Sequence, residues 1–221
     1  MTLRARTRPG RLRALDAWLL HFAPELLDGR GALVDVGFGE SPVTTEEWAK
    51  TAPAARVVGL DVRAAASNEV ELHVGGFEDV QRFAPIAVVR AMNVLRSYRE
   101  EDVAPARALM RRGLLPDGLL IEGSSDTDGH VLVVSLSRGE RGALLFHTGF
   151  TRGFDPRLFR DWLPRDLRRG VKPGTPLHTF FTEWSERTHG ETPRERFENS
   201  LAAPLEWTEW ERANGFVRWS P

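Results

Sequence analysis

The chain lacks cysteine altogether, contains a single tyrosine, and has no long hydrophobic segment. Without cysteine it cannot form disulfides, thiolate-ligated zinc or iron–sulfur sites, or a thiol nucleophile. No apolar run approaches the roughly 20 residues that span a bilayer, and the apolar stretch at 15–20 is too short for the core of a signal peptide. We therefore expect a cytoplasmic protein with no membrane partner.

Lysine is almost absent as well: arginine supplies 28 of the 30 basic residues. With 31 acidic residues the net charge is −1, which excludes a uniformly basic nucleic-acid binder. Residues 31–150 carry 12 basic and 17 acidic side chains, a net of −5, whereas arginines concentrate in residues 4–13 and 152–169. An acidic middle segment suits a cationic ligand, and clustered arginines suit anions. A smaller arginine group surrounds Asn93: Arg90, Arg96 and Arg99.

The first half of the chain alternates between short apolar runs and amphipathic segments. Five runs rich in Val, Ile and Leu are typical of strands buried on both faces of a parallel sheet; they are 32–37, 56–61, 70–74, 86–91 and 118–122. The segments 10–28, 44–50 and 100–112 predict helices between or before them. Such alternation predicts a doubly wound α/β sheet.

The remainder has a different pattern. Residues 130–137 and 142–147 predict a β-hairpin, and the later segments predict helices at 155–168, 176–187 and 193–213 and a short strand at 216–219. The predicted fold is α/β, with a doubly wound, mostly parallel Rossmann-like sheet, a β-hairpin and a helical C-terminal section. We predict a cofactor-binding core with its N-terminal helix over 1–150, and a helical section over 151–221 that covers the substrate site.

A candidate binding site follows the first two predicted strands. Gly37 and Gly39 come directly after the first strand, where glycines let the backbone turn tightly and approach a ligand. Asp61 ends the second strand and can accept hydrogen bonds from both hydroxyls of a ribose. A pyrophosphate would be repelled by Glu40, and Ser41 stands where dinucleotide fingerprints have their third glycine. S-Adenosylmethionine has no phosphate and carries a cationic sulfonium, so the carboxylates favour it over a nicotinamide dinucleotide.

Ordered motifs along the chain resemble those of class I S-adenosylmethionine-dependent methyltransferases. They are Leu33-Val-Asp-Val-Gly-Phe-Gly39, Gly59-Leu-Asp61, Asn93-Val-Leu95 and Leu115-Pro-Asp-Gly-Leu-Leu-Ile121. The resemblance covers roughly residues 30–125. Further stretches resemble a little-characterised bacterial branch of that superfamily: Ser41-Pro-Val-Thr-Thr45, Gly75-Gly-Phe-Glu78, Arg90-Ala-Met-Asn-Val-Leu-Arg-Ser-Tyr98 and Glu122-Gly-Ser-Ser-Asp126.

The resemblance implies a role for each matching position. Asp35, Gly37 and Gly39, with Glu40 beside them, would lie along the methionine part of S-adenosylmethionine. Asp61 would hold its ribose. Gly76 and Phe77 follow the third strand, where such enzymes hold the adenine, and Asn93 would face both cofactor and substrate. Phe77 as a core residue and Asn93 as a helix N-cap are the alternatives. The superfamily's usual strand order after the fifth strand is not evident in this sequence.

Three residues are candidates for chemistry on the methyl acceptor: Asn93, Asp126 and Tyr98. Proximity supplies much of the acceleration in methyl transfer, and a general base is needed only when the acceptor must lose a proton. Asp126-Thr-Asp-Gly-His130 has metal-ligand residue types, but a polar turn before the hairpin explains it better, and we expect no metal. Tyr98 is the only tyrosine and could border the acceptor pocket, but a partly buried helix residue explains it better.

The sequence thus predicts an S-adenosylmethionine-dependent methyltransferase whose acceptor is a small molecule. An RNA methyltransferase is an alternative, since arginine stretches can neutralise phosphates, although no RNA-binding module is recognisable. A non-catalytic cofactor-binding or interaction protein with the same fold is another. The arginines leave open an acidic or phosphate-bearing acceptor, and the tryptophan-rich final third leaves open a homodimer.

Overall fold

One sheet of nine strands runs through the molecule, and the computed structural model describes residues 8–220 of it. The strand order is β3-β2-β1-β4-β5-β6-β7-β9-β8. The strands are β1 Ala32–Val36, β2 Val57–Asp61, β3 Glu71–Val74, β4 Ile86–Met92, β5 Leu114–Ser125, β6 Val131–Arg138, β7 Arg141–Thr148, β8 Leu205–Glu206 and β9 Phe216–Trp219. Strands β1 to β5 pair in parallel and the rest antiparallel, which confirms the predicted Rossmann-like α/β sheet with its hairpin.

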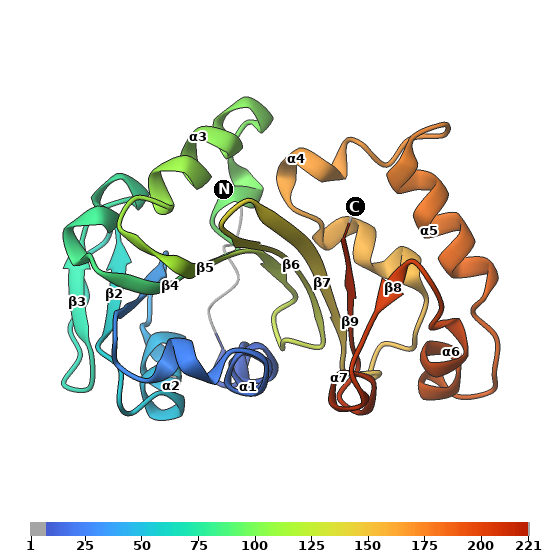
Figure 1. Cartoon of the computed structure of the whole chain (residues 1–221), viewed down its shortest axis with the longest axis horizontal. Helices are drawn as coiled ribbons and strands as arrows, with labels where there is room; N and C mark the ends of the chain where they lie inside the picture. The colour runs from blue at the N-terminus through green and yellow to red at the C-terminus, as the bar shows by residue number, and fades with distance from the viewer. Residues whose placement is uncertain (1–7, 221) are drawn as a thin grey trace.

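Helices cover both faces of the parallel half. Helix α1 (Arg13–Phe22), the 3₁₀ turn η1 (Pro24–Leu27) and α2 (Val43–Thr51) lie on one face, and η2 (Phe77–Phe83) and α3 (Glu100–Met110) on the other. In Figure 1, α1 and α2 lie below the strands and α3 lies above them. This is the doubly wound arrangement, and it places ligands at the carboxyl ends of the strands.

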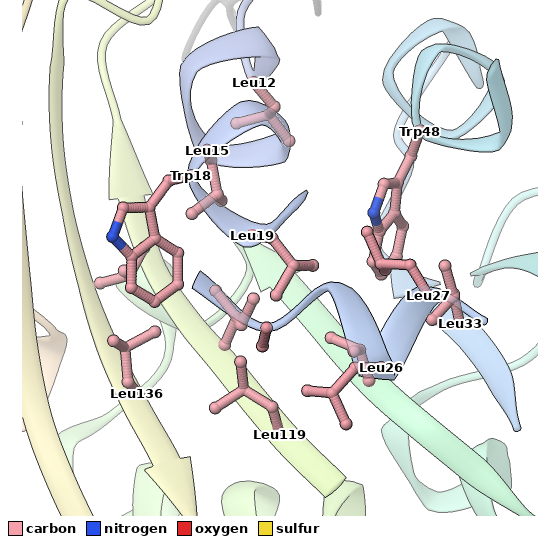
Figure 2. Close-up of a cluster of buried hydrophobic side chains, with 14 of the residues drawn as sticks. Leu12, Leu15, Trp18, Leu19, Leu26, Leu27, Leu33, Trp48, Leu119 and Leu136 are labelled. Atoms are coloured by element: carbon pink, nitrogen blue, oxygen red, sulfur yellow. The ribbon is translucent and has the colours of Figure 1, made fainter. Parts of the chain in front are cut away.

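The α1 face buries a leucine-rich core. Figure 2 shows Leu12, Leu15 and Leu19 of the first helical segment pointing toward the sheet, with Trp48 of α2 beside them. Leu12, Leu15 and Leu19 recur every three or four residues, so they share one helix face, and each is about 1% exposed. Removing one such side chain costs about 2–5 kcal/mol of folding free energy. The core fixes α1 over the strands that carry the site.

The C-terminal section packs an aromatic core against the hairpin. It contains η4 (Pro156–Trp162), α4 (Arg165–Arg168), α5 (Pro176–Glu186), α6 (Pro193–Ser200) and α7 (Glu209–Ala213). Phe146 of β7 meets Phe159 and Trp184, with ring centroids 5.2 and 5.3 Å apart. Figure 1 shows α5 and α6 at the side of the molecule farthest from β3, with α4 nearer the middle, beside α3. Most of this section therefore supports the hairpin.

Two predicted helices of this section differ in the structure. The segment 155–168 forms η4 and the short α4, because Pro164 stands between them. The segment 193–213 forms α6, β8 and α7, because Pro204 interrupts it. Strands β8 and β9 join the common sheet, so 151–221 is less helical than expected and shares one sheet with 1–150. No helix among residues 8–220 is long and apolar enough to cross a membrane.

Candidate functional site

A cavity of about 730 Å³ opens at the carboxyl ends of β1, β2, β4 and β5. These strand ends meet at one edge of the sheet because the strands are parallel, which is where ligands bind in such sheets. The residues around it come from the turns after β1, β2, β3 and β4, from the end of β5, from η4 and from the turn before α1. Its lining includes most of the predicted site residues: Gly37, Gly39, Glu40, Asp61, Gly76, Phe77, Asn93 and Tyr98. Asp35 and Asp126 do not line it.

The turn after β1 forms the floor of the cavity. Gly37 and Gly39 have φ angles of 79° and 83°, in the region where side chains are disfavoured. A Cβ atom on Gly37 would lie 2.5 Å from Cγ2 of Val94, so the position excludes any larger residue. The amide of Gly37 donates to the carbonyl of Leu60. The turn therefore keeps its backbone exposed to the cavity and bound to β2.

Asp61 holds this turn from the end of β2. Its carboxylate accepts hydrogen bonds from the amide of Gly39 at 2.8 Å and from the amide of Arg63 at 2.9 Å, and it is 7% exposed. Nε of Arg63 donates a third hydrogen bond at 3.4 Å. A carboxylate has about four acceptor positions, so one remains for a hydroxyl group of a ligand. The Arg63 guanidinium lies between Asp61 and Glu40, 3.8 Å from the Glu40 carboxylate. Glu40 and Asp61, each predicted as a cofactor-binding residue, thus both line the cavity and share Arg63 as a partner.

Aromatic and amide groups shape the opposite wall. Phe77 and Tyr98 meet edge to face, with centroids 5.7 Å apart. Asn93 has a φ of 63°, and its side-chain amide donates to the Ser125 carbonyl and accepts from the Ser125 amide. Asn93 therefore ties the end of β4 to the end of β5 and does not cap a helix. Each of its two polar atoms makes one hydrogen bond to Ser125, so Asn93 positions the wall of the cavity and keeps one N–H and one oxygen lone pair for a ligand.

Asp35 has a different place from the one the motif implied. It is 3% exposed, and Arg90 on the neighbouring strand β4 binds both of its oxygens at 2.9 Å. Arg90 also binds Asp16 of α1 at 2.5 Å and covers the ring of Trp48. Burial raises the pKa of Asp16 to about 7, although the charge of Arg90 opposes this. Asp35 and Arg90 thus join helix to sheet, and Arg90 does not face an acceptor.

Asp126 is likewise a structural residue. One carboxylate oxygen accepts from the amides of His130 and Val131, which closes the turn into β6, and the other lies 3.1 Å from Arg152. The side chain is 2% exposed. Within residues 8–220, no three His, Asp or Glu side chains are grouped as metal ligands.

Arg11 is a cavity residue that sequence reasoning did not single out. Its side chain comes from the turn before α1, is 8% exposed, and donates to the Ser125 hydroxyl at 3.4 Å. Its Nε has no hydrogen-bond partner among the described residues, and burial lowers the pKa of its guanidinium. In the sequence, only its place in the arginine-rich stretch 4–13 pointed to Arg11 as a binding residue. Arg4 and Arg6 of that stretch lie outside the described residues, and Arg8 pairs with Asp128 at 2.7 Å.

The far end of the cavity lies between η3 (Leu95–Ser97) and η4. Arg96 covers the ring of Trp162 at 5.0 Å, and Ser97, Tyr98 and Thr127 complete this end. Trp162 is the one described residue of 151–221 that lines the cavity. No carboxylate among the described lining residues lies on η3 or η4, since Glu40 and Asp61 belong to the β1 and β2 ends.

Known structures share parts of this fold at low identity. The LepI complex with S-adenosylmethionine is 13% identical with a TM-score of 0.39 and covers 50% of this chain and 30% of LepI. The PH0226 protein from Pyrococcus horikoshii OT3 is 17% identical with a TM-score of 0.41, over 56% of this chain and 69% of that one. Magnesium protoporphyrin IX methyltransferase (ChlM) from Synechocystis PCC 6803, with bound S-adenosylmethionine, is 17% identical with a TM-score of 0.40, over 55% and 68%. No protein-family model and no curated protein matches the sequence.

Proposed function

We propose that this chain is an S-adenosylmethionine-dependent methyltransferase that acts on a small molecule. The observation that carries the proposal is the Asp61 carboxylate, buried at the end of β2 and bound to the amide of Gly39 in the glycine turn after β1. This arrangement offers hydrogen-bond acceptors to a ribose and leaves a polar backbone surface beside them. The cavity of about 730 Å³ is large enough for a nucleoside-containing ligand and a small second molecule.

The same cavity is poorly suited to a nicotinamide dinucleotide. A dinucleotide fold adds a second set of parallel strands beyond β4, whereas here only β5 follows in parallel and β6 turns antiparallel. Glu40 and Asp61 line the cavity beside the glycine turn, where a pyrophosphate would have to lie. Carboxylates there repel phosphate and attract a cation, and the pairing of both with Arg63 reduces this effect without removing it.

The lining residues match the separate groups of the methyl donor. Asp61 would accept from the ribose hydroxyls, and Phe77 would cover the adenine. Gly37 and Gly39 would let the backbone approach the methionine part. Arg11 would bind the donor's carboxylate, because its buried guanidinium has an Nε without a partner among the described residues. S-Adenosylmethionine supplies a methyl group activated by its positive sulfur.

The residues at the far end of the cavity position an acceptor without removing its proton. Asn93 is committed to Ser125, and Asp126 faces the hairpin turn. A nucleophile that reacts there brings its own lone pair, with any proton lost to water. Such an enzyme works by bringing its two reactants together, which is sufficient for methyl transfer from a sulfonium.

An RNA acceptor is the second candidate. Ion pairs made by arginines of the C-terminal section argue against it. Three of the arginines in 152–172 are paired within the protein: Arg152 with Asp126, Arg157 with Asp155, and Arg169 with Glu100. Paired guanidinium groups contribute less to phosphate neutralisation than free ones. A non-catalytic cofactor-binding protein has the same donor residues and differs only in turnover.

Calorimetry tests the proposal. We expect S-adenosylmethionine and S-adenosylhomocysteine to bind and NAD not to bind. Asp61→Asn should weaken S-adenosylhomocysteine at least tenfold, since the loss of a hydrogen bond from a charged group is worth about 1.5–3 kcal/mol. Asp117→Asn, at an exposed ion pair with Arg30 outside the cavity, is the matched control. Absence of heat with both sulfur compounds in the wild-type protein would refute the proposal.

A further inference from the structure

We propose that the methyl acceptor is an anion, carrying a carboxylate or a phosphate, and that it is bound by an arginine cluster at the far end of the cavity. The cluster consists of Arg96, Arg165 and Arg168. That the bound anion is the methyl acceptor rests on the proposed function. The anion site itself rests on the three arginines.

Two segments far apart in the sequence bring the cluster together. Arg96 lies in η3 and lines the cavity, with its guanidinium over the ring of Trp162. Arg165, at the start of α4, donates from Nε to the carbonyl of Tyr98, another lining residue, at 3.1 Å. Arg168 is one turn further along α4 and lines a smaller cavity of about 300 Å³ with Arg157, Arg160, Asp161 and Val171. The cluster therefore borders the larger cavity through Arg96 and the smaller one through Arg168, while Arg165 contacts the wall of the larger cavity at the Tyr98 carbonyl.

Two carboxylates near the cluster are occupied elsewhere, and a third, Asp161, lines the smaller cavity with Arg168. Asp166, between Arg165 and Arg168 in the sequence, pairs with Arg107 at 2.6 Å, and Arg107 also binds Glu122. Glu100 lies 3.5 Å from Arg169. Within residues 8–220, no carboxylate lies within ion-pair distance of the three cluster arginines. The three arginines thus have no ion-pair partner in the described part of the chain, and Asp161 is the one carboxylate whose charge acts on Arg168.

Arg168 shows that these charges act on one another. Burial, then the charges of Arg96 and Arg165, lower the pKa of Arg168, and only Asp161 opposes them. Its Nε is buried without a partner among the described residues, although one terminal nitrogen donates to the Leu163 carbonyl. Crowded guanidinium groups are destabilising unless an anion binds among them, and planar forks match carboxylate and phosphate oxygens.

Trp162 adds a condition on the rest of the acceptor. Its ring is partly exposed, lines the cavity, and is covered by Arg96 on one face. An apolar or aromatic portion of the acceptor can pack beside the ring while its anionic group meets the cluster. The cavity therefore fits a small aromatic or partly apolar anion better than an inorganic one.

Small probes test the anion site directly. Phenyl phosphate and benzoate represent the two anions, and benzamide is the neutral match; each is titrated into protein saturated with S-adenosylhomocysteine. We expect at least one anion to bind more tightly than benzamide. Arg96→Gln and Arg165→Gln should each weaken that anion about tenfold, while S-adenosylhomocysteine binding stays unchanged. Arg99→Gln is the matched control, since Arg99 is exposed, pairs with Asp102 and does not line the cavity.

Each outcome decides between distinct conclusions. Equal binding of benzamide and both anions, or unchanged anion binding in folded Arg96→Gln and Arg165→Gln, would overturn the anion site. A single-stranded oligoribonucleotide that binds more tightly than both anions, in a manner dependent on Arg96, would overturn the small-molecule acceptor. If wild-type protein binds no S-adenosylhomocysteine yet still binds an anion through Arg96, methyl transfer fails while the anion site stands.

Discussion

Individual arginines have different roles in this protein. Arg90 is 1% exposed and neutralised by Asp16 and Asp35, whereas Arg11 is 8% exposed and lines the cavity with an Nε that lacks a partner. Arg99 is exposed and pairs with Asp102. A guanidinium can thus hold the core, bind a ligand or remain at the surface, and its neighbours in space decide which.

We therefore expect a substitution of Arg11 to weaken the binding of only those ligands that carry a carboxylate. Arg11→Gln should weaken S-adenosylhomocysteine binding about tenfold, because a charge-assisted hydrogen bond to the ligand carboxylate would be lost. Adenosine, which lacks the carboxylate, should bind the variant and the wild type equally well. Calorimetry with the two ligands separates this role from general damage to the cavity: equal weakening of both would contradict it.

His147 of β7 should make folding depend on pH. Burial lowers its pKa to about 4, from an ordinary value of 6.5. The neutral ring therefore stabilises the fold fully above pH 6.5, and this contribution is lost as pH falls toward 4. From this group we expect about 2 kcal/mol less stability at pH 5 than at pH 7. Urea unfolding of His147→Leu should show a smaller difference between the two pH values; an undiminished difference would assign it to other groups.

At the scale of elements, the site depends on contacts between turns. The glycine turn after β1 packs on Val94, which follows β4, and the Asn93 amide joins β4 to Ser125 of β5. Asp61 joins the end of β2 to the same turn. Four strand ends are thus connected by side chains that also line the cavity.

Gly37→Ala tests how tightly these turns fit. The added Cβ would lie 2.5 Å from Val94 and would require a residue other than glycine at a φ of 79°. We expect a loss of more than 1 kcal/mol of stability and at least tenfold weaker S-adenosylhomocysteine binding. Val94→Ala in the same chain should relieve the clash but not the backbone strain, so recovery should be partial. Gly139→Ala is the matched control, since its φ is also positive and nothing lies near its Cβ. Complete recovery in the double variant would show that φ is unimportant here.

Arg90 of β4 pairs with Asp16 of α1 and with Asp35 of β1. These buried ion pairs form a clamp that holds α1 against the sheet and so sets the position of Arg11. Arg90→Met should destabilise the protein by about 3–5 kcal/mol, because Asp16 and Asp35 would be left buried without their partner. Arg99→Gln should cost at most about 1 kcal/mol, since its pair is exposed. Thermal unfolding of both variants gives the comparison, and a similar small loss in each would show that the clamp is not needed for stability.

At the scale of the whole molecule, two buried groups respond to pH in opposite directions. The pKa of Asp16 is raised by burial to about 7, so its favourable protonated state is fully present below its ordinary 3.8 and is lost as pH rises through about 7. His147 gains stability over much of the same range. We expect Asp16→Asn to make the protein relatively more stable at pH 8 than at pH 5, compared with wild type. The same urea titrations check this, and a change in the other direction would contradict the raised pKa.

The molecule also joins two regions of different construction through one sheet. The parallel half carries the glycine turn, Asp61 and Arg96, and the antiparallel half supports η4 and α4, which place Trp162, Arg165 and Arg168 near Arg96. The proposed anion site thus draws on both regions of the chain. The Arg96→Gln and Arg165→Gln experiments test one residue from each region.

The sequence by itself determined the parallel half, with the glycine turn and Asp61 at its edge, because those features follow from local patterns: apolar runs of strand length, glycines after a strand, and an aspartate at a strand end. It did not determine that Asp35 faces Arg90, that Arg11 and Arg96 line the cavity, or that Arg165 and Arg168 lie near Arg96. Those facts depend on contacts between segments 55 or more residues apart, such as Asp35 with Arg90. Local pattern fixes which residues end a strand, and only packing between distant segments decides which charges neutralise one another and which remain for a ligand.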